Sequence, residues 1–306
     1  MRSELRRLAD DTSLAAVSAG FVATLVGFTS TIALIFHAAT ALGATPAQVS
    51  SWVWALGLGL GMGLGSIGLS LWTRIPIRIT WSTPGAAVIA SAATGVSLPE
   101  AVGAFVVCGA LMWLSGVSGL FERLMNRIPI TLAAALLAGI LAKFALMAFA
   151  GTTAQPLLVI SMFVVYLVGR RVWPRYAVLG VLVSGVLVAA AQGLLRTDAL
   201  SWALAQPVWV TPAWSWQAIL GMGVPLFIVP RASQAVPGVS AIRVAGYQPP
   251  VSSLMSWSGA GTVLLAPFGG YAFNLAAITA AIVLQPHAHP DPHKRYTAAL
   301  VAGLFY

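Results

Sequence analysis

The sequence predicts an all-α polytopic membrane protein, and three observations lead to that fold class. First, 59% of the 306 residues are hydrophobic and only 8% are charged, whereas soluble domains carry about 25% charge. Second, apolar runs of about 20 residues, the length that crosses the hydrocarbon layer, recur along the whole chain. Third, two of these runs are interrupted by residues that break a helix. This composition excludes both an ordinary soluble protein and a disordered chain.

The uninterrupted apolar runs follow a short charged N-terminus, Met1 to Asp11. The first run is longer than the apolar core of a signal peptide, so we expect it to be retained as a span. The predicted spans are residues 14–39, 50–72, 99–121, 129–150, 155–169, 176–195, 216–236 and 251–268. The last run, Thr297 to Tyr306, is too short to cross a bilayer. We expect it to be the start of an eleventh span in a chain whose C-terminal part is truncated.

The 16 basic residues predict the orientation of these spans. With the N-terminus in the cytoplasm, nearly all of them fall on the inner side, as the positive-inside bias requires. Arg196 falls on the outer side, and Lys143 and Arg231 fall within spans. One missed helix would invert everything after it, so this agreement also supports the assignment of the spans. We therefore expect a multi-pass protein with a cytoplasmic N-terminus.

The two interrupted runs are residues 75–96 and 267–286. Trp81-Ser82-Thr83-Pro84-Gly85 interrupts the first, and Pro267-Phe268-Gly269-Gly270 interrupts the second. We expect each run to form a short extended segment followed by a half-helix. Non-helical backbone at this depth is tolerated only where it is buried or lines a cavity. Unpaired amide groups at the start of a half-helix provide a site for an anion.

A later part of the chain repeats an earlier part at one constant offset. The matched pairs are Ser30 with Ser233, Gly43 with Gly246, Pro46 with Pro249, Ser50 with Ser253 and Trp54 with Trp257. An odd number of spans separates the copies, so the second copy is inverted relative to the first, as in many secondary transporters. Each interrupted run follows the repeated region in its own copy. We therefore expect the two interrupted runs to meet near the middle of the membrane.

Charged residues within the predicted spans are the next candidates for a site. Arg231 lies in the middle of span 216–236, where an unpaired cation is expensive and usually functional, so it is a candidate to bind a substrate carboxylate. The alternatives are a cation that faces a cavity without contacting substrate, and a misplaced span boundary. Arg78, just before the first interruption, is similar but lies nearer the inner surface.

Acidic residues are absent from the middle of every predicted span. Metal-dependent hydrolysis and intramembrane proton relays both need such carboxylates or clustered ligands. Gly63-Leu64-Gly65-Ser66-Ile67-Gly68 has the spacing of a dinucleotide-binding loop, but it lies inside a predicted span, so we interpret it as a bare helix face for tight packing. We therefore expect no enzyme, no metal site and no cofactor.

Several motifs occur in order along essentially the whole chain. They are Ile79-Thr80-Trp81-Ser82-Thr83-Pro84-Gly85-Ala86-Ala87, Ala232-Ser233-Gln234, Pro237-Gly238-Val239, Ala266-Pro267-Phe268-Gly269-Gly270, Asn274-Leu275-Ala276-Ala277-Ile278-Thr279-Ala280-Ala281 and His289-Pro290-Asp291-Pro292. Together they resemble the benzoate/proton symporter family (BenE). The resemblance implies the fold of nucleobase transporters, with two inverted seven-helix repeats divided into a core and a gate domain.

On this plan the chain divides into four parts. These are core helices 1–4 at residues 1–126, gate helices 5–7 at 127–196, an outer loop at 197–215, and core helices 8–10 with the start of helix 11 at 216–306. The rest of the fold, including half of the gate, would then be missing from this sequence.

The resemblance also implies a function and a site. The function is proton-coupled uptake of benzoate or a related aromatic carboxylate by alternating access across the bacterial inner membrane, and a homodimer is compatible with relatives of this fold. The residues expected to bind the carboxylate through backbone amides are Ser82, Thr83, Gly85, Asn274 and Leu275. The expected polar contacts are Ser30, Ser233 and Gln234, and the residue expected against the substrate ring is Phe273.

Two features bear on the substrate. Where nucleobase carriers of this fold place a carboxylate, the sequence has Ser233 and Phe273, which suits an anionic, mostly apolar ring. The sequence departs from the family pattern at Pro230-Arg231 and at Ala235, and Arg78 is also atypical of the family. The proton carrier is either the substrate itself or a group such as Glu100. A neutral-ligand permease of the same fold and a non-transporting membrane fragment are the alternative functions.

Overall fold

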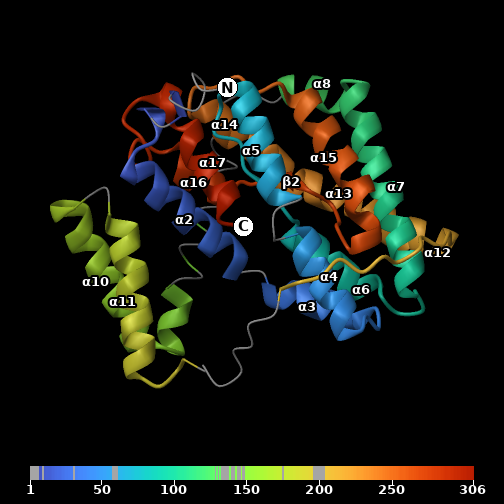
Figure 1. Cartoon of the computed structure of the whole chain (residues 1–306), viewed down its shortest axis with the longest axis horizontal. Helices are drawn as coiled ribbons and strands as arrows, with labels where there is room; N and C mark the ends of the chain where they lie inside the picture. Colours follow the sequence, from blue (N-terminus) through green and yellow to red (C-terminus); the bar gives the residue numbers. More distant parts are fainter. Residues whose placement is uncertain are drawn as a thin grey trace.

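Helices make up most of the fold, with two short strands buried among them (Figure 1). The computed structural model describes residues 7–8, 10–29, 32–56, 61–127, 129, 131, 138, 142, 146, 149–173, 176–195 and 204–306. Within these ranges, the helices long and apolar enough to cross a membrane are Leu14–Ala41, Leu98–Val117 and Trp216–Val244. The prediction of a mainly helical membrane protein is confirmed. Several of the other predicted spans are instead divided into shorter helices.

The first part of the chain carries the first interrupted run. Its elements are α2 (Leu14–Thr29), α3 (Ile32–Ala41), α4 (Pro46–Leu56), α5 (Met62–Thr73), β1 (Ile79–Thr80), α6 (Thr83–Ala92), α7 (Leu98–Val117) and α8 (Leu120–Asn126). The predicted span 99–121 ends early, because Gly119 takes up left-handed backbone (φ 66°) between α7 and α8. Glycine adopts this conformation at no steric cost.

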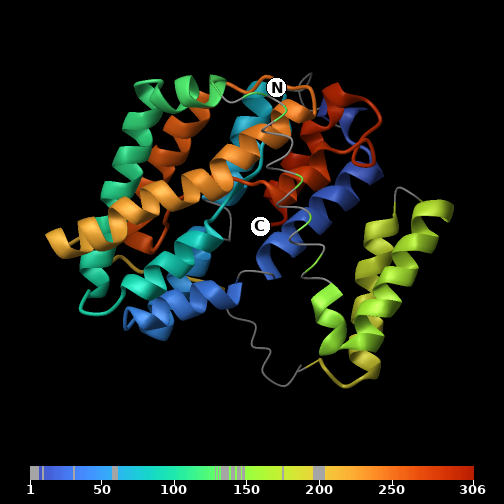
Figure 2. The same cartoon turned by 180° about the vertical axis from the view of Figure 1, so that it is seen from behind.

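A helical hairpin stands at one side of the molecule in both views (Figures 1 and 2). Its elements are the 3-10 turn η1 (Gly151–Thr153), α10 (Pro156–Val172) and α11 (Ala177–Ala191). These two helices correspond to the predicted spans 155–169 and 176–195. Most of the predicted span 129–150 lies outside the described residues, as does Lys143.

One long helical stretch runs from Trp216 to Val244. It consists of α12 (Trp216–Ala218), η2 (Ile219–Gly223), α13 (Val224–Pro230), η3 (Arg231–Ala235) and α14 (Val236–Val244), of which η2 and η3 are π-helical. Each π-helical segment ends two residues before a proline, Pro225 or Pro237. The predicted end of this helix at residue 236 is wrong, because wider π turns accommodate proline rings that clash with a regular helix.

The second interrupted run follows this helix. The remaining elements are α15 (Val251–Leu265), η4 (Ala266–Phe268), β2 (Asn274–Leu275), α16 (Ile278–Leu284), η5 (Pro292–Lys294) and α17 (Tyr296–Leu304). β1 and β2 pair antiparallel, with Ile79 opposite Leu275 and Thr80 opposite Asn274. The prediction that both runs break into an extended segment and a half-helix, and that the two breaks meet, is confirmed.

Glycines allow the helices around the strands to approach closely. α17 packs against α2 and α5, and a Cβ atom on Gly63 of α5 would lie 2.8 Å from the Gly303 carbonyl oxygen of α17. A Cβ atom on Gly65 would lie 3.3 Å from the Ile79 side chain of β1. The interpretation of this glycine-rich segment as a packing face is therefore confirmed.

Candidate substrate site at the paired strands

The free edge of the first extended segment is bonded to side chains of α5. The Ser70 hydroxyl accepts from the Ile77 amide at 3.0 Å and donates to the Ile77 carbonyl at 3.0 Å. Ser66 does the same for Ile79, at 3.0 and 3.4 Å. Ser66 and Ser70 are four helical residues apart, a rise of about 6 Å, and Ile77 and Ile79 are two extended residues apart, a rise of about 6.6 Å. Each serine therefore lies beside one of these backbone positions. These bonds satisfy backbone groups that lipid could not.

The half-helix α6 begins with a side-chain cap. Ser82 is fully buried, and its hydroxyl accepts a hydrogen bond from the Gly85 amide at 2.9 Å. A Cβ atom on Gly85 would lie 2.8 Å from Ser82 Cβ, so glycine is needed for this close approach. The Gly85 amide is therefore already used by the cap. The Ser82 hydroxyl accepts in this bond, so its own proton remains free to donate. Thr83, the first residue of α6, is half-buried.

Asn274 and Leu275 form the second strand and are fully buried. The Asn274 side-chain amide donates to the Ala272 carbonyl at 3.0 Å, while its oxygen Oδ1 has no partner within the described ranges. The backbone just before the strand is unusual, since Ala272 has a φ of 39°, a region that non-glycine residues rarely adopt. Gly238 of α14 lies against β2, where its Cβ would be 3.0 Å from the Leu275 carbonyl oxygen.

The π-helical segment η3 contacts β2 and carries the next predicted residues. Ser233 is exposed, and its hydroxyl donates to the Val229 carbonyl of its own helix at 2.7 Å. The side-chain oxygen of Gln234 is buried and has no hydrogen-bond partner among the described residues. η3 therefore lies against β2 and carries one exposed hydroxyl and one unpartnered amide oxygen.

Arg231 begins the same segment and is held by aromatic and sulfur contacts. Its guanidinium carbon lies 5.2 Å from the centroid of the Phe121 ring and 5.3 Å from that of Phe227. Nη1 donates to the Met255 sulfur at 2.7 Å. The side chain is buried, and Nε and Nη2 have no partner in the part of the chain that the structure describes.

Arg78 is also buried and directly precedes β1. Its carbonyl accepts from the Ala276 amide at 2.9 Å, which ties it to the end of β2. Its guanidinium donates from Nη2 to the Tyr306 hydroxyl at 2.8 Å and from Nη1 to the Thr24 hydroxyl at 3.5 Å. Arg78 therefore lies at the junction of the two broken segments.

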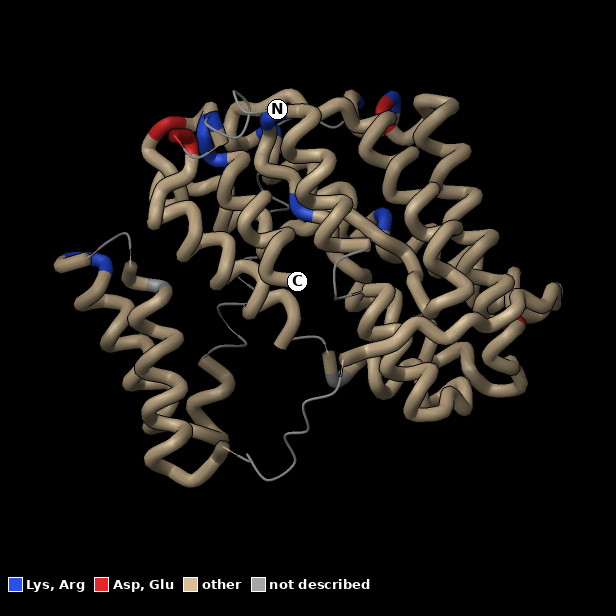
Figure 3. Tube along the Cα trace, in the orientation of Figure 1, with Lys and Arg blue, Asp and Glu red and all other residues tan. Residues whose placement is uncertain are grey.

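The charges are distributed unevenly in depth. Figure 3 shows most charged positions along the edge that carries the N-terminus, with two basic positions inside the bundle. Arg78 and Arg231 are buried, whereas every Asp and Glu side chain in the described ranges is exposed or half-buried. The interior around the paired strands is therefore electropositive.

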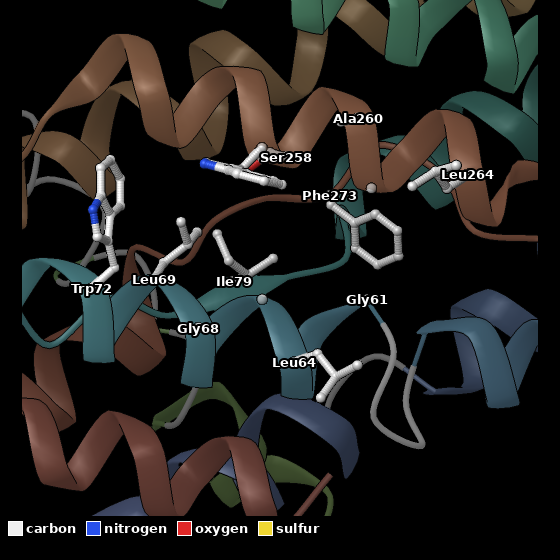
Figure 4. A pocket seen from close by; sticks show the side chains of 13 residues that line it. Gly61, Leu64, Gly68, Leu69, Trp72, Ile79, Ser258, Ala260, Leu264 and Phe273 are labelled. Atoms are coloured by element: carbon white, nitrogen blue, oxygen red, sulfur yellow. The ribbon is translucent and has the colours of Figure 1, made fainter. Parts of the chain in front are cut away.

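An apolar cavity of about 620 Å³ lies between α5 and α15, next to the strands (Figure 4). The Phe273 ring and the Ile79 side chain lie between the two helices, and Ser258 of α15 lines the same space. The Ser258 hydroxyl is buried without a hydrogen-bond partner among the residues described. Phe273 is the one predicted site residue that lines this cavity.

The structure thus brings most of the predicted residues to one region. The two strands, the start of α6 and η3 meet there, while the Phe273 ring lies in the neighbouring cavity and Ser30 lies outside the described residues. Sequence reasoning missed the hydroxyl groups of Ser66 and Ser70. Their four-residue spacing within an apolar, glycine-rich segment was the available signal.

Comparison with known proteins identifies the group to which this arrangement belongs. The family model described as benzoate membrane transport protein (BenE) matches residues 10–306. The chain belongs to the BenE family. It is 34% identical over 306 residues to the benzoate membrane transport protein of Acinetobacter baylyi, covering 100% of this chain and 77% of that relative. It is also 46% identical over 288 residues to the inner membrane protein YdcO of Escherichia coli, covering 94% and 73%.

Family membership confirms the resemblance found in the motifs. This BenE-family chain is a membrane transport protein by family, and its relatives include an inner membrane protein. The paired strands, the buried Arg78 and Arg231 beside them and the apolar cavity are the parts of the molecule that offer contacts to a substrate.

Proposed function

We propose that this chain is a secondary active transporter that takes up benzoate or a related aromatic carboxylate. The observation that carries the proposal is the charge of the interior. Arg78 and Arg231 are buried, and no buried carboxylate balances them within the described ranges. A buried charge without a counter-ion costs several kcal/mol (about 3–5). A transported anion would supply the missing charge.

The chemistry around the strands suits a carboxylate. The Ser82 hydroxyl, the Thr83 amide and the side chain of Asn274 offer hydrogen-bond donors close to the positive end of α6. Ser233 and Gln234 add polar groups from η3, and Leu275 continues the strand. The Phe273 ring in the apolar cavity offers an aromatic surface next to the strands. An aromatic carboxylate combines these two requirements.

The transport cycle is part of the same proposal. Core helices at residues 1–126 and 216–306 would move against gate helices at 127–196, joined by the outer loop at 197–215, in an inverted-repeat fold with alternating access. The N-terminus would be cytoplasmic, which the gathering of charged positions along its edge supports (Figure 3). Proton coupling and a homodimer rest on the family resemblance.

Uptake of labelled benzoate into proteoliposomes tests the function, with an inward proton gradient imposed. We expect gradient-dependent uptake that Asn274→Ala and Ser233→Ala abolish. Ser240→Ala is the matched control for Ser233→Ala, because each hydroxyl donates at 2.7 Å to the carbonyl four residues earlier in the same helical stretch. Competition by uracil would identify a neutral-ligand permease instead. Uptake without a gradient would contradict the proton coupling.

A further inference from the structure

Four polar side chains, three of them buried and one half-buried, form a group where the two broken segments meet. This group, the Arg78 cluster, consists of Arg78 before β1, Thr24 of α2, Thr279 of α16 and Tyr306 after α17. Arg78 is 1% exposed, and besides its bonds to the two hydroxyls, its guanidinium carbon lies 4.8 Å from the centroid of the Tyr306 ring. The two hydroxyl partners are neutral, so the cluster carries a full positive charge.

Two donors of the Arg78 cluster are unused. Arg78 Nε and Thr279 Oγ1 are buried without a hydrogen-bond partner in the described part of the chain. The cluster is compact around Gly27, where a Cβ atom would lie 3.2 Å from Thr279 Cγ2 and 3.3 Å from the Tyr306 hydroxyl. Arg78 precedes the first strand and Thr279 follows the second. Each broken segment therefore carries one unused donor in this region.

Arg231 differs from Arg78 in what surrounds its guanidinium. The rings of Phe121 and Phe227 and the sulfur of Met255 enclose it. Aromatic faces stabilise a cation directly, so Arg231 is held without an anion even though its Nε and Nη2 have no partner among the described residues. Arg78 contacts one aromatic ring, that of Tyr306, and also donates to two hydroxyls, which a carboxylate replaces with a stronger, charge-assisted bond.

We propose that Arg78 recognises the negative charge of the transported carboxylate, which binds between the unused Nε–H of Arg78 and the hydroxyl of Thr279. Without substrate, Arg78 Nη2 donates to the Tyr306 hydroxyl. When substrate binds, the second carboxylate oxygen replaces the Tyr306 hydroxyl as the acceptor of this bond. Arg78 is therefore the residue that selects a monoanion over a neutral molecule of the same shape. This inference rests on the proposed function and assigns its charge selectivity.

Binding of benzoate and of benzamide, its neutral isostere, separates charge recognition from folding. Both affinities are measured on the purified full chain by calorimetry. We expect Arg78→Gln to weaken benzoate binding by about tenfold or more, the usual scale of a lost charge-assisted bond, while benzamide changes by less than about twofold. Arg78→Lys, which keeps the charge, should restore most of the preference for benzoate.

Arg295→Gln is the matched control, because Arg295 is also buried but donates to the backbone carbonyls of Leu284 and His289, away from the strands. It should leave the benzoate-to-benzamide ratio unchanged. A ratio that responds to Arg231→Gln and not to Arg78→Gln would overturn the inference, as would an unchanged ratio in both. Wild-type protein that binds neither ligand would refute the proposed function and the inference together.

Discussion

The hydrogen bonds between α5 and the first extended segment lead to a quantitative prediction for Ser70→Ala. Ser70 is fully buried, and its hydroxyl makes two bonds of 3.0 Å to the amide and the carbonyl of Ile77. Removing the hydroxyl leaves the buried Ile77 carbonyl without its donor, which costs about 1–3 kcal/mol, while the Ile77 amide keeps only its 2.8 Å bond to the Ile75 carbonyl. Measured polar contacts in membrane helices average only about 0.6 kcal/mol. We therefore expect Ser70→Ala to lower the free energy of unfolding by about 2 kcal/mol.

Ser240→Ala provides the control for this experiment. Ser240 is equally buried, but its hydroxyl donates at 2.7 Å to the Val236 carbonyl of its own helix. That carbonyl also belongs to the helical ladder, so the loss should stay below about 0.5 kcal/mol. Ser66→Ala should fall between the two, because one of its bonds is longer, at 3.4 Å.

The assay is equilibrium unfolding in mixed micelles at increasing SDS fraction, followed by circular dichroism. The Ser70→Ala variant should unfold at a clearly lower SDS fraction than Ser240→Ala. Equal midpoints for the two variants would refute the claim that serine side chains of α5 hold the strand in place.

Three further predictions concern the same framework. Gly63→Ala should destabilise the fold by about 1–3 kcal/mol, since its Cβ would lie 2.8 Å from a backbone oxygen of α17. Gly68→Ala, which has open space at its Cβ, should be neutral or stabilise the fold by up to about 1 kcal/mol. Equal melting temperatures for the Gly63→Ala and Gly68→Ala variants would contradict this prediction. Ser82→Ala should cost about 1 kcal/mol by removing the α6 cap, read as a lower melting temperature; an unchanged value would show that the cap is dispensable. The hydrogen bond from Tyr296 lowers the pKa of Asp11, so the ionised carboxylate stabilises the fold above about pH 4 and this stabilisation is lost as the pH falls through the lowered pKa. Asp11→Asn should therefore melt lower than wild type at pH 7, by an amount worth under about 1 kcal/mol, with the difference closing in acid; a constant difference would contradict the assignment.

Much of the fold could be predicted from the sequence, because lipid imposes simple rules on it. The breaks at Pro84 and at Pro267 to Gly270 could be predicted, because few residue types interrupt an apolar helix. Each break produces a short extended segment followed by a half-helix. Their pairing is predicted from the sequence matches at one constant offset. The extension of the helix through Pro237 was not readable, because whether a proline ends a helix or is absorbed by a π turn depends on its tertiary neighbours.

The candidate site was predicted less completely than the fold. Asn274 and Ser82 were found because they flank the breaks, whereas the partners of Arg78 come from α2, α16 and the end of α17, which are far apart in the sequence. Burial also changes what a residue can do: Gly85 was expected to offer its amide to a substrate, but the adjacent Ser82 side chain uses it. Side-chain contacts of this kind depend on packing that no local pattern encodes.

The proposed transport depends on a carboxylate that binds where the two broken segments meet. An electron cryo-microscopy map of the benzoate-saturated protein in nanodiscs tests it most directly. We expect ligand density beside the paired strands, with the carboxylate within hydrogen-bond distance of Arg78 and Thr279. Density enclosed by Phe121 and Phe227 at Arg231, or lying wholly within the cavity between α5 and α15, would contradict it.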